Sequence, residues 1–275
     1  MTMVEAALPQ TSSPRGLRTR VFGIDVDILA REGALDRLAG GWSASGAATP
    51  LRVVTANLHH VLLNRSPGPF RDALAAADLV LADGMPLVWA SRLSARRLPE
   101  RVAGSDLLLP VCQRAAGDGA SVFVLGTTLP VLVRACRRLV GWCPGLRIAG
   151  VYAPPFGFAA DHPLSEEAVS MIERCRPDVL FLALGAPRQE LWMHAHYARL
   201  RAKVVICVGA SFDFVAEAQQ RAPRLVQRVG LEWLWRLALS PRRLGGRYAA
   251  ILAMLPVVLV EQARAWRRER EGNTG

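Results

Sequence analysis

The chain has 275 residues, of which 51% are hydrophobic, so it can bury a full core in one large domain or in one domain with an extension. Its five cysteines show no CxxC or His-rich spacing, which excludes the common zinc motifs and favours buried free thiols. Residues 1–16 contain no apolar stretch, so we expect no secretory signal and a disordered tail over residues 1–20.

The formal net charge of +11 is concentrated in the last fifth of the chain. Residues 221–275 carry 11 arginines and 4 glutamates, a net +7, around a 12-residue apolar run at 249–260. That run is too short for a membrane span, which needs roughly 20 residues. A nucleic-acid-binding protein is one interpretation of so basic a chain, and its affinity would fall steeply with salt. An apolar run beside arginines fits an anionic membrane surface better.

Taken in chain order, residues 21–220 alternate between strand and helix patterns. Residues 21–29 read as an edge strand or hairpin, a short helix follows over 31–39, and 85–98 reads as an amphipathic helix. Continuous apolar runs, typical of strands buried on both faces, occur at 53–54, 79–81, 121–126, 146–152, 179–185 and 204–209. About six strands separated by helices predict an α/β fold with a Rossmann-like, doubly wound, mainly parallel sheet.

The pattern changes near residue 220. Beyond it we find no further strand, and the sequence becomes helical, tryptophan-rich and basic. We therefore predict three regions: the tail over 1–20, a Rossmann-like catalytic domain over 21–220, and a helical basic appendage over 221–275.

Residues 52–85 form a predicted βαβ unit that carries polar side chains at its strand ends. Thr55 and Asn57 end the first strand, and Asp83 follows the second. Parallel strands joined by a crossover place their carboxyl ends on the same edge of a sheet, where ligands bind in open α/β folds. We expect these three side chains to face one cleft.

Each of these motifs also has a plainer structural interpretation. Asp83 suits a general base but equally a helix cap, and Thr55 and Asn57 suit a polyhydroxyl ligand but also the cap of a helix at Leu58. In GAPRQE (185–190), Gln189 suits the edge of a uracil or a hydroxyl, but the motif is also ordinary loop chemistry. His59 and His60 fit packing better than metal binding. The sequence lacks GxGxxG, GxxxxGK[ST] and GxSxG motifs.

Taken together, the motifs are more specific than any one of them. TxN, ADG, RVAGSDL, GAPRQE, VGASFDF, RAP and LEWLWRL…PRRLGGRY follow one another in this order. Over about residues 21–250 the chain closely resembles the WecG/TagA/CpsF family of bacterial glycosyltransferases.

The resemblance implies inverting transfer of a sugar from a UDP-sugar to a polyprenyl-diphosphate-linked acceptor in cell-surface polysaccharide or exopolysaccharide synthesis. It places the enzyme peripherally at the cytoplasmic face of the inner membrane. The implied catalytic residues are Asp83, as general base, and Thr55. The substrate-binding candidates are Asn57, Gly84, Gly126, Gly185, Arg188, Gln189, Glu190, Asp213, Arg236, Arg243 and Arg247.

No cofactor is expected, and because no DxD pair stands at a strand end, we favour arginines and helix N-termini over a required metal for stabilising a leaving UDP. The family usually has glycine at the position of Glu217 and an aromatic-glycine loop at 154–157, so the donor sugar stays open between N-acetylmannosamine and glucose. A UDP-sugar-binding protein without transferase activity is the alternative. The sequence leaves a homo-oligomer open as well.

Overall fold

The computed structural model describes residues 16–44, 49–228 and 230–272. Within them, a six-stranded parallel sheet runs in the order β4-β3-β8-β7-β5-β6. The strands are β3 (Leu51–Ala56), β4 (Leu79–Ala82), β5 (Ser121–Gly126), β6 (Arg147–Tyr152), β7 (Val179–Ala183) and β8 (Val204–Cys207). Every residue of β4, β5, β7 and β8 is buried, which is why these strands read as unbroken apolar runs. The predicted α/β fold with a parallel sheet is confirmed.

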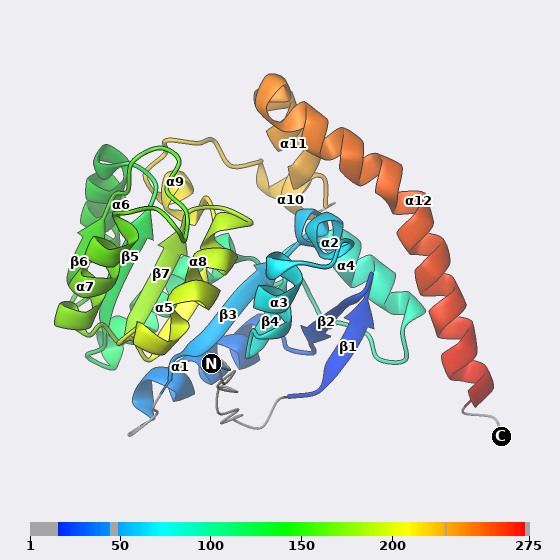
Figure 1. The fold of residues 1–275 in the computed structure, drawn as a ribbon, viewed down its shortest axis with the longest axis horizontal. Helices are drawn as coiled ribbons and strands as arrows, with labels where there is room; N and C mark the ends of the chain where they lie inside the picture. The colour runs from blue at the N-terminus through cyan, green and yellow to red at the C-terminus, as the bar shows by residue number, and fades with distance from the viewer. Residues whose placement is uncertain (1–15, 45–48, 229, 273–275) are drawn as a thin grey trace, which may run out of the picture.

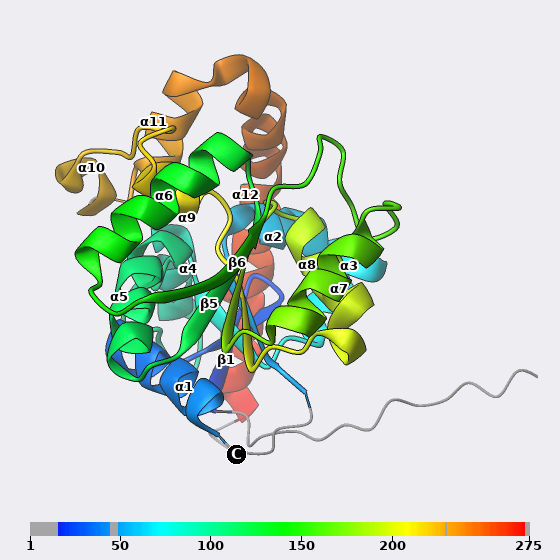
Figure 2. The ribbon, with the colours of Figure 1, turned by 90° about the vertical axis from the view of Figure 1, so that its left-hand side faces the viewer.

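Helices cover both faces of this sheet (Figures 1 and 2). One apolar core lies under α1 (Arg31–Ser43), α5 (Gly104–Gly117), α6 (Leu129–Trp142) and α9 (Ser211–Val215). The other lies under α2 (Leu58–Asn64), α3 (Pro69–Ala75), α7 (Ser165–Cys175) and α8 (Arg188–His196), and η2 (Tyr197–Arg199) follows α8. After β3 the chain passes to α2 on one face of the sheet, whereas after the adjacent β8 it passes to α9 on the other face. Ligands of α/β sheets bind in the crevice where connections diverge in this way.

The N-terminal strands form the hairpin that the alternating pattern suggested. Strands β1 (Arg18–Val21) and β2 (Ile24–Asp27) pair antiparallel as a separate two-stranded sheet, and Phe22 and Gly23 form the turn with φ values of 49° and 80°. The hairpin is fixed to the large sheet by the buried Asp27, whose Oδ2 accepts a 2.7 Å hydrogen bond from the Val80 amide. The first strand begins inside the expected tail, of which residues 1–15 lie outside the described residues.

Two helices differ in length from the prediction. Helix α1 extends to Ser43 rather than 39, and Gly41 within it packs against β8, where a Cβ would come within 2.8 Å of Val204 Cγ2. The helix expected over 85–98 stops early, as α4 (Met85–Ala90) and a 3₁₀ turn η1 (Ser91–Leu93). The Ser91 hydroxyl accepts a 2.9 Å hydrogen bond from the Leu98 amide, which draws the chain back on itself.

Beyond residue 220 the described chain is helical, as expected. Helices α10 (Arg224–Arg228) and α11 (Glu232–Leu239) lead into α12 (Pro241–Gly272), which runs along one side of the molecule (Figure 1). One stripe of α12 is buried against the domain, at Leu244, Ile251, Met254, Val258 and Gln262. Gln262 joins it to the hairpin, accepting a 2.8 Å hydrogen bond from the Phe22 amide.

The length argument against a membrane span is wrong for α12. The helix continues on both sides of the 12-residue run: the segment Leu244–Arg268 has 25 residues, and an 18-residue window within it has a mean hydropathy of 1.5. By length and composition alone this segment is sufficient to cross a membrane, and 22% of that window is buried in the protein.

Replacing Gly126 with alanine should destabilise the fold strongly. Its φ is 139°, and a Cβ would lie 2.4 Å from the backbone of Ala183 in the neighbouring strand. We expect Gly126→Ala to lower the free energy of unfolding by more than about 2 kcal/mol. The matched control is Gly40→Ala in α1, where nothing lies within 4 Å and alanine should stabilise the helix by about 0.5–1 kcal/mol. Equal melting temperatures for the two variants would contradict this packing.

Candidate active site

A cavity of about 240 Å³ lies at the carboxyl ends of β3, β4, β7 and β8. Its floor comes from the loops that follow these strands, and its roof from α11 and the first part of α12, which Figure 1 shows above the sheet. The strand-end residues that line it are Thr55, Asn57, Asp83, Gly84, Gly185 and Gln189, and the roof contributes Glu232, Trp233, Arg236, Arg247 and Tyr248. The edge of the sheet where the βαβ unit predicted a cleft therefore carries a cavity, which α11 and α12 cover.

Thr55 and Asn57 are both held in place by the backbone around them. The Thr55 hydroxyl donates a 3.0 Å hydrogen bond to the carbonyl of Cys207 on the adjacent strand. Asn57 caps α2: its side chain accepts a hydrogen bond of 3.0 Å from the His59 amide. The structural interpretation of Asn57 as a cap is thus correct, and the residue also lines the cavity.

Asp83 follows β4 directly and is half-buried beneath the roof. Its amide donates a 2.7 Å hydrogen bond to the Ala56 carbonyl, which keeps it beside the end of β3. Burial, and next the Glu232 carboxylate, raise the pKa of Asp83 to about 7. The guanidinium groups of Arg101 and Arg236 act in the opposite direction. A carboxylate with a pKa near neutrality is suited to accept a proton at pH 7.

Gln189 joins the loops that follow β7 and β8. Its Oε1 accepts hydrogen bonds from the Gly185 amide at 3.2 Å and from the Gly209 amide at 3.1 Å. Both glycines have positive φ, at 74° and 55°. Gln189 is 3% exposed and lines the cavity, so its side chain shapes the wall that a ligand would contact.

Glu190 lies behind this wall rather than in the cavity. The residue is fully buried, and its Oε1 accepts hydrogen bonds from Gln189 Nε2 at 2.7 Å and from His60 Nε2 at 3.2 Å. The Nδ1 of His60 lies 3.3 Å from the Asn57 amide, which donates to it. The Glu190 carboxylate thus contacts Gln189 directly and Asn57 through His60, and its contact with substrate stays a prediction.

Three arginines line the cavity: Arg101 before α5, Arg236 on α11 and Arg247 on α12. Arg101 also fastens the roof, since it donates to Glu232 Oε2 at 2.9 Å and to Asp106 Oδ2 at 2.6 Å. Arg221 pairs with Asp106 from the other side. The cavity thus combines one carboxyl group able to take up a proton with several fixed positive charges.

Three of the remaining candidates, Gly126, Arg188 and Asp213, fall outside the lining of the cavity. Gly126 is needed for the close approach of β5 to β7, Arg188 is exposed at the start of α8, and Asp213 accepts a 3.2 Å hydrogen bond from the Thr127 hydroxyl. The side chain of Arg243 lies outside the described part of the structure.

Several lining residues had no role in the ligand site predicted from the sequence. Arg101 stood unassigned in RVAGSDL, although that motif opens a helix at the ligand-binding edge. Trp233 and Tyr248 come from the roof, with ring centroids 5.7 Å apart. His59 also lines the cavity, where burial and then Arg247 lower its pKa to about 4, so it is neutral at pH 7.

Among the described residues, no three His, Cys, Asp or Glu side chains are grouped as a metal ion would require.

One departure from the family pattern has a clear conformational cost. Glu217, where we expect the family to have glycine, has a φ of 53°, in the left-handed region that glycine adopts most readily. Its carboxylate lies 2.8 Å from the guanidinium of Arg138 on α6, an exposed ion pair away from the cavity.

Comparison with known proteins agrees with this geometry. Residues 19–270 match the model of the glycosyl transferase WecG/TagA/CpsF family. A Bacillus subtilis protein named N-acetylglucosaminyldiphosphoundecaprenol N-acetyl-beta-D-mannosaminyltransferase is 35% identical over 173 residues, 62% of this chain and 65% of the relative. A Bacillus spizizenii protein of the same name is 33% identical over 63% of this chain, again 65% of the relative. The chain thus spans somewhat less than two thirds of these two proteins.

A Staphylococcus aureus protein of that name is 27% identical over 252 residues, which are 90% of this chain and 93% of the relative. The family match covers the parallel sheet, the residues around the cavity and the helical roof. The chain therefore belongs to the glycosyl transferase WecG/TagA/CpsF family.

Proposed function

We propose that this protein transfers a sugar from a UDP-sugar to a polyprenyl-diphosphate-linked acceptor, with inversion at the anomeric carbon. The observation that carries the proposal is the Asp83 carboxyl, whose pKa is raised to about 7 in a cavity lined by three arginines. The named relatives in Bacillus and Staphylococcus are N-acetyl-β-D-mannosaminyltransferases that act on N-acetylglucosaminyldiphosphoundecaprenol. We therefore favour N-acetylmannosamine over glucose as the transferred sugar.

In the proposed reaction, ionised Asp83 accepts the proton of the acceptor hydroxyl as its oxygen attacks the anomeric carbon of the donor. The new carbon–oxygen bond forms while the bond from that carbon to the β-phosphate breaks, and UDP leaves with the electron pair. Attack from the face opposite UDP inverts the configuration. Thr55 and Asn57, each anchored by backbone hydrogen bonds, would orient the reacting sugars.

The leaving UDP needs positive charge beside its diphosphate. Arg236 and Arg247 supply it from the roof, and guanidinium groups bind phosphate oxygens through charge-assisted, bidentate hydrogen bonds. Because both arginines belong to the appendage, we propose that residues 221–275 complete the site. In this arrangement the walls shaped by Gln189 and by the backbone at Gly209 hold the nucleotide.

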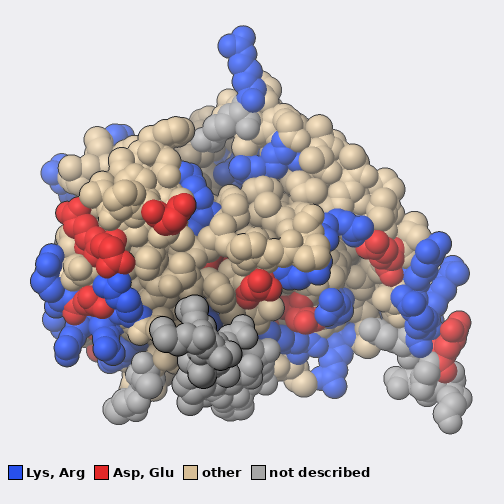
Figure 3. Space-filling view, viewed as in Figure 1, with Lys and Arg blue, Asp and Glu red and all other residues tan. Residues whose placement is uncertain are grey.

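We also propose that α12 places the enzyme peripherally on the cytoplasmic face of the membrane. The side of the helix opposite its buried stripe is apolar and exposed, at Leu252, Val257, Leu259 and Val260. Exposed arginines follow at its C-terminal end, where Figure 3 shows a basic cluster. Basic residues near an anionic leaflet contribute about 1 kcal/mol each, so the apolar face and these charges would act together. The acceptor, a lipid, would then enter the cavity from that surface.

Replacing Asp83 with asparagine should abolish most transfer without harming the fold. We expect kcat to fall by about 10²–10⁴-fold, measured as product mass from UDP-sugars and a diphosphate-linked acceptor. In the wild type, the ionised base exists only above the pKa of Asp83, so kcat/KM should rise with pH through about 7 and then level off.

A stability measurement supplies the control. The raised pKa of Asp83 means that its ionisation opposes folding, so Asp83→Asn should have the higher melting temperature at pH 8, and the difference should shrink toward pH 4. Near-native turnover in this variant would remove Asp83 from the mechanism. UDP-sugar binding by the wild type without transfer to any acceptor would favour the alternative of a catalytically silent binding protein.

Arg247→Ala should lower kcat/KM by about 10- to 100-fold, the effect of losing one charge-assisted hydrogen bond to a diphosphate. Arg242→Ala is the matched control, because Arg242 is exposed on the same helix and does not line the cavity. Calorimetry with UDP should show weaker binding for the first variant alone. Equal effects of the two changes would mean that only the net charge of α12 matters.

The double variant Leu252→Glu/Leu259→Glu should weaken binding to anionic vesicles by at least about tenfold, since each leucine contributes about 1.5–3 kcal/mol when fully buried. The two side chains are 48% and 43% exposed, so the fold should tolerate both changes. Leu129→Glu on α6, where the leucine is 55% exposed, is the control. Sedimentation with vesicles that is unchanged in the double variant would contradict the role of α12.

A further inference from the structure

One buried carboxylate links three of the loops that form the candidate active site. Glu190 lies in the first turn of α8, fully buried, and its Oε1 accepts hydrogen bonds from Gln189 Nε2 at 2.7 Å and from His60 Nε2 at 3.2 Å. Gln189 continues the chain of hydrogen bonds to the loops after β7 and β8, and His60 continues it to Asn57 after β3. All three loops contribute residues to the cavity.

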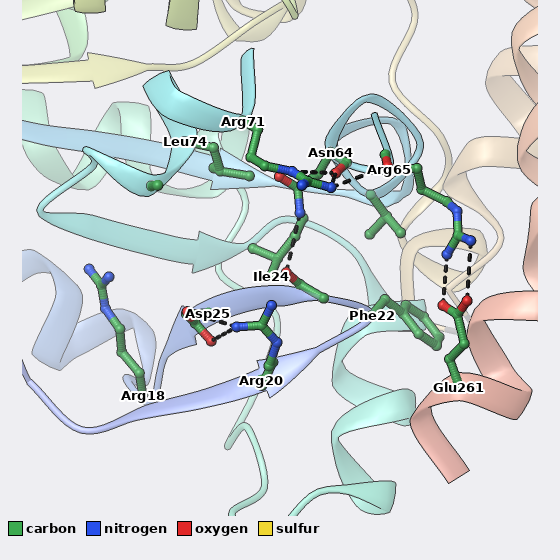
Figure 4. A pocket seen from close by; sticks show the side chains of 13 residues that line it. Arg18, Arg20, Phe22, Ile24, Asp25, Asn64, Arg65, Arg71, Leu74 and Glu261 are labelled. Carbon is green, nitrogen blue, oxygen red and sulfur yellow. Dashed lines mark hydrogen bonds and ion pairs between the residues drawn. The ribbon is translucent and has the colours of Figure 1, made fainter. Parts of the chain in front are cut away.

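The surroundings of Glu190 are costly for a carboxylate. Its Oε2 is buried without a hydrogen-bond partner among the described residues, and His60 is the one ion-pairing side chain found beside it there. A buried polar atom without a partner costs about 1–3 kcal/mol. The carboxylates beside the N-terminal hairpin differ: Asp25 and Glu261, drawn in Figure 4, are 53% and 54% exposed and each pairs with an arginine. Burial at such a cost calls for an explanation other than stability.

On the Gln189 side, the carboxylate fixes which way the amide group faces. Gln189 Oε1 accepts from two backbone amides, while its Nε2 donates to Glu190. Turning the amide over would set its NH₂ group against two other donors and its oxygen against a carboxylate. One orientation is therefore compatible with all three contacts, and Glu190 supplies the part of this constraint that comes from behind the cavity wall.

On the His60 side, the carboxylate sets the tautomer of the ring. An acceptor facing Nε2 keeps a proton on that nitrogen, so in the neutral ring Nδ1 is itself an acceptor and takes the Asn57 amide hydrogen at 3.3 Å. In the other tautomer Nδ1 would instead donate to Asn57 Oδ1, which lies 3.1 Å away. Phe70 packs against the ring, with centroids 5.7 Å apart. The contact that Asn57 receives thus depends on the oxygen at the far side of the ring.

We propose that Glu190 is a positioning residue: one of its oxygens holds Gln189 and, through the tautomer of His60, Asn57 in the orientation that a ligand meets. The consequences for catalysis rest on the proposed function, in which Gln189 shapes the nucleotide site and Asn57 orients the reacting sugars. The network has two branches. Loss of His60 disturbs the Asn57 branch alone, and loss of Glu190 disturbs both.

Hydrogen exchange in the free, full-length protein tests the Gln189 branch without any ligand. In Glu190→Leu, peptides containing Gly185 and Gly209 should exchange about tenfold faster than in the wild type, while β5 keeps its rate. Glu190→Gln should exchange like the wild type, because its side-chain oxygen can accept both hydrogen bonds. Faster exchange throughout the chain, or equal exchange in the two variants, would overturn the positioning role.

Ser165→Ala is the matched control for these measurements. Ser165 is buried, and its hydroxyl accepts a 3.2 Å hydrogen bond from Trp192 on the same helix as Glu190, away from the cavity. Its loss should lower the melting temperature but leave the exchange of both glycine loops unchanged. Faster exchange of those loops in Ser165→Ala would mean that any buried defect beside α8 loosens them, and would overturn the specific role of Glu190.

Nitrogen-15 chemical shifts of the histidine rings at pH 8 test the His60 branch. The wild type and Glu190→Gln should carry the His60 proton on Nε2, and Glu190→Leu should carry it on Nδ1. The His60→Phe protein identifies the signal by its absence. A wild-type proton on Nδ1 or on both nitrogens, or an unchanged tautomer in Glu190→Leu, would overturn the inference. The wild-type tautomer decides this point even if Glu190→Leu does not fold.

Turnover and UDP calorimetry then separate the two branches. His60→Phe should lower kcat about tenfold and leave the dissociation constant for UDP within about threefold, whereas Glu190→Leu should also weaken UDP binding about tenfold. Glu190→Gln should keep both values. A Glu190→Gln protein as inactive as Glu190→Leu would assign the carboxylate a direct contact with substrate and overturn the positioning role. A wild type that neither binds UDP nor transfers sugar would end the proposed function, while the exchange and tautomer results would stand.

Discussion

The Asp83 carboxyl lies where β4 ends, and the packing of α11 and α12 over that point restricts its access to water. This burial is the main cause of its raised pKa, and the Glu232 carboxylate on the roof adds to it. An aspartate at an open strand end would stay ionised far below neutral pH and would be a weak base. The chemistry proposed for the sheet therefore depends on helices that follow it by more than 140 residues in the sequence.

The roof in turn depends on a small set of charges and on one stripe of α12. Arg101 and Arg221 hold Asp106 and Glu232 in a shared network, so the start of α5 and the start of α11 are tied at the rim of the cavity. Ile251, Met254 and Val258 continue the attachment through apolar contact with the sheet domain. The two kinds of attachment, ion pairs and apolar contacts, differ in their response to salt, because salt screens partly exposed ion pairs but not apolar burial.

Much of the fold could be predicted because the strands are buried on both faces and therefore appear as unbroken apolar runs. The position of Asp83 beside Thr55 followed from the same reasoning, since parallel strands share one edge. Local patterns were insufficient where a distant neighbour decides the outcome. The helix predicted over 31–39 continues through Gly40 and Gly41, and the glycine at position 41 is needed because Val204 leaves no room for a Cβ. The apolar run at 249–260 has only 12 residues, yet α12 continues on both sides of it.

In the site, too, the local sequence predicted some features, whereas contacts between distant residues decide others. The motif at 185–190 contributes Gly185 and Gln189 to the cavity lining, but the contacts within it depend on the whole fold: Glu190 meets His60, 130 residues away in sequence. Nothing in the local sequence distinguishes a buried carboxylate that positions its neighbours from one that touches substrate. The contribution of Trp233 and Tyr248 to the cavity could not be predicted for a similar reason. Their place over the cavity depends on how α11 and α12 pack over the ends of the strands.

The Gln189 side chain also bears on conformational entropy. Gly185 and Gly209 have φ values that few other residues adopt, and glycines in loops are the residues with most freedom to lose. Ordering the backbone of one residue costs about 1–2 kcal/mol. Because one amide oxygen holds both glycines in the free protein, that ordering is complete before any ligand arrives. The affinity of the cavity for its ligand is then not reduced by the work of arranging these two loops.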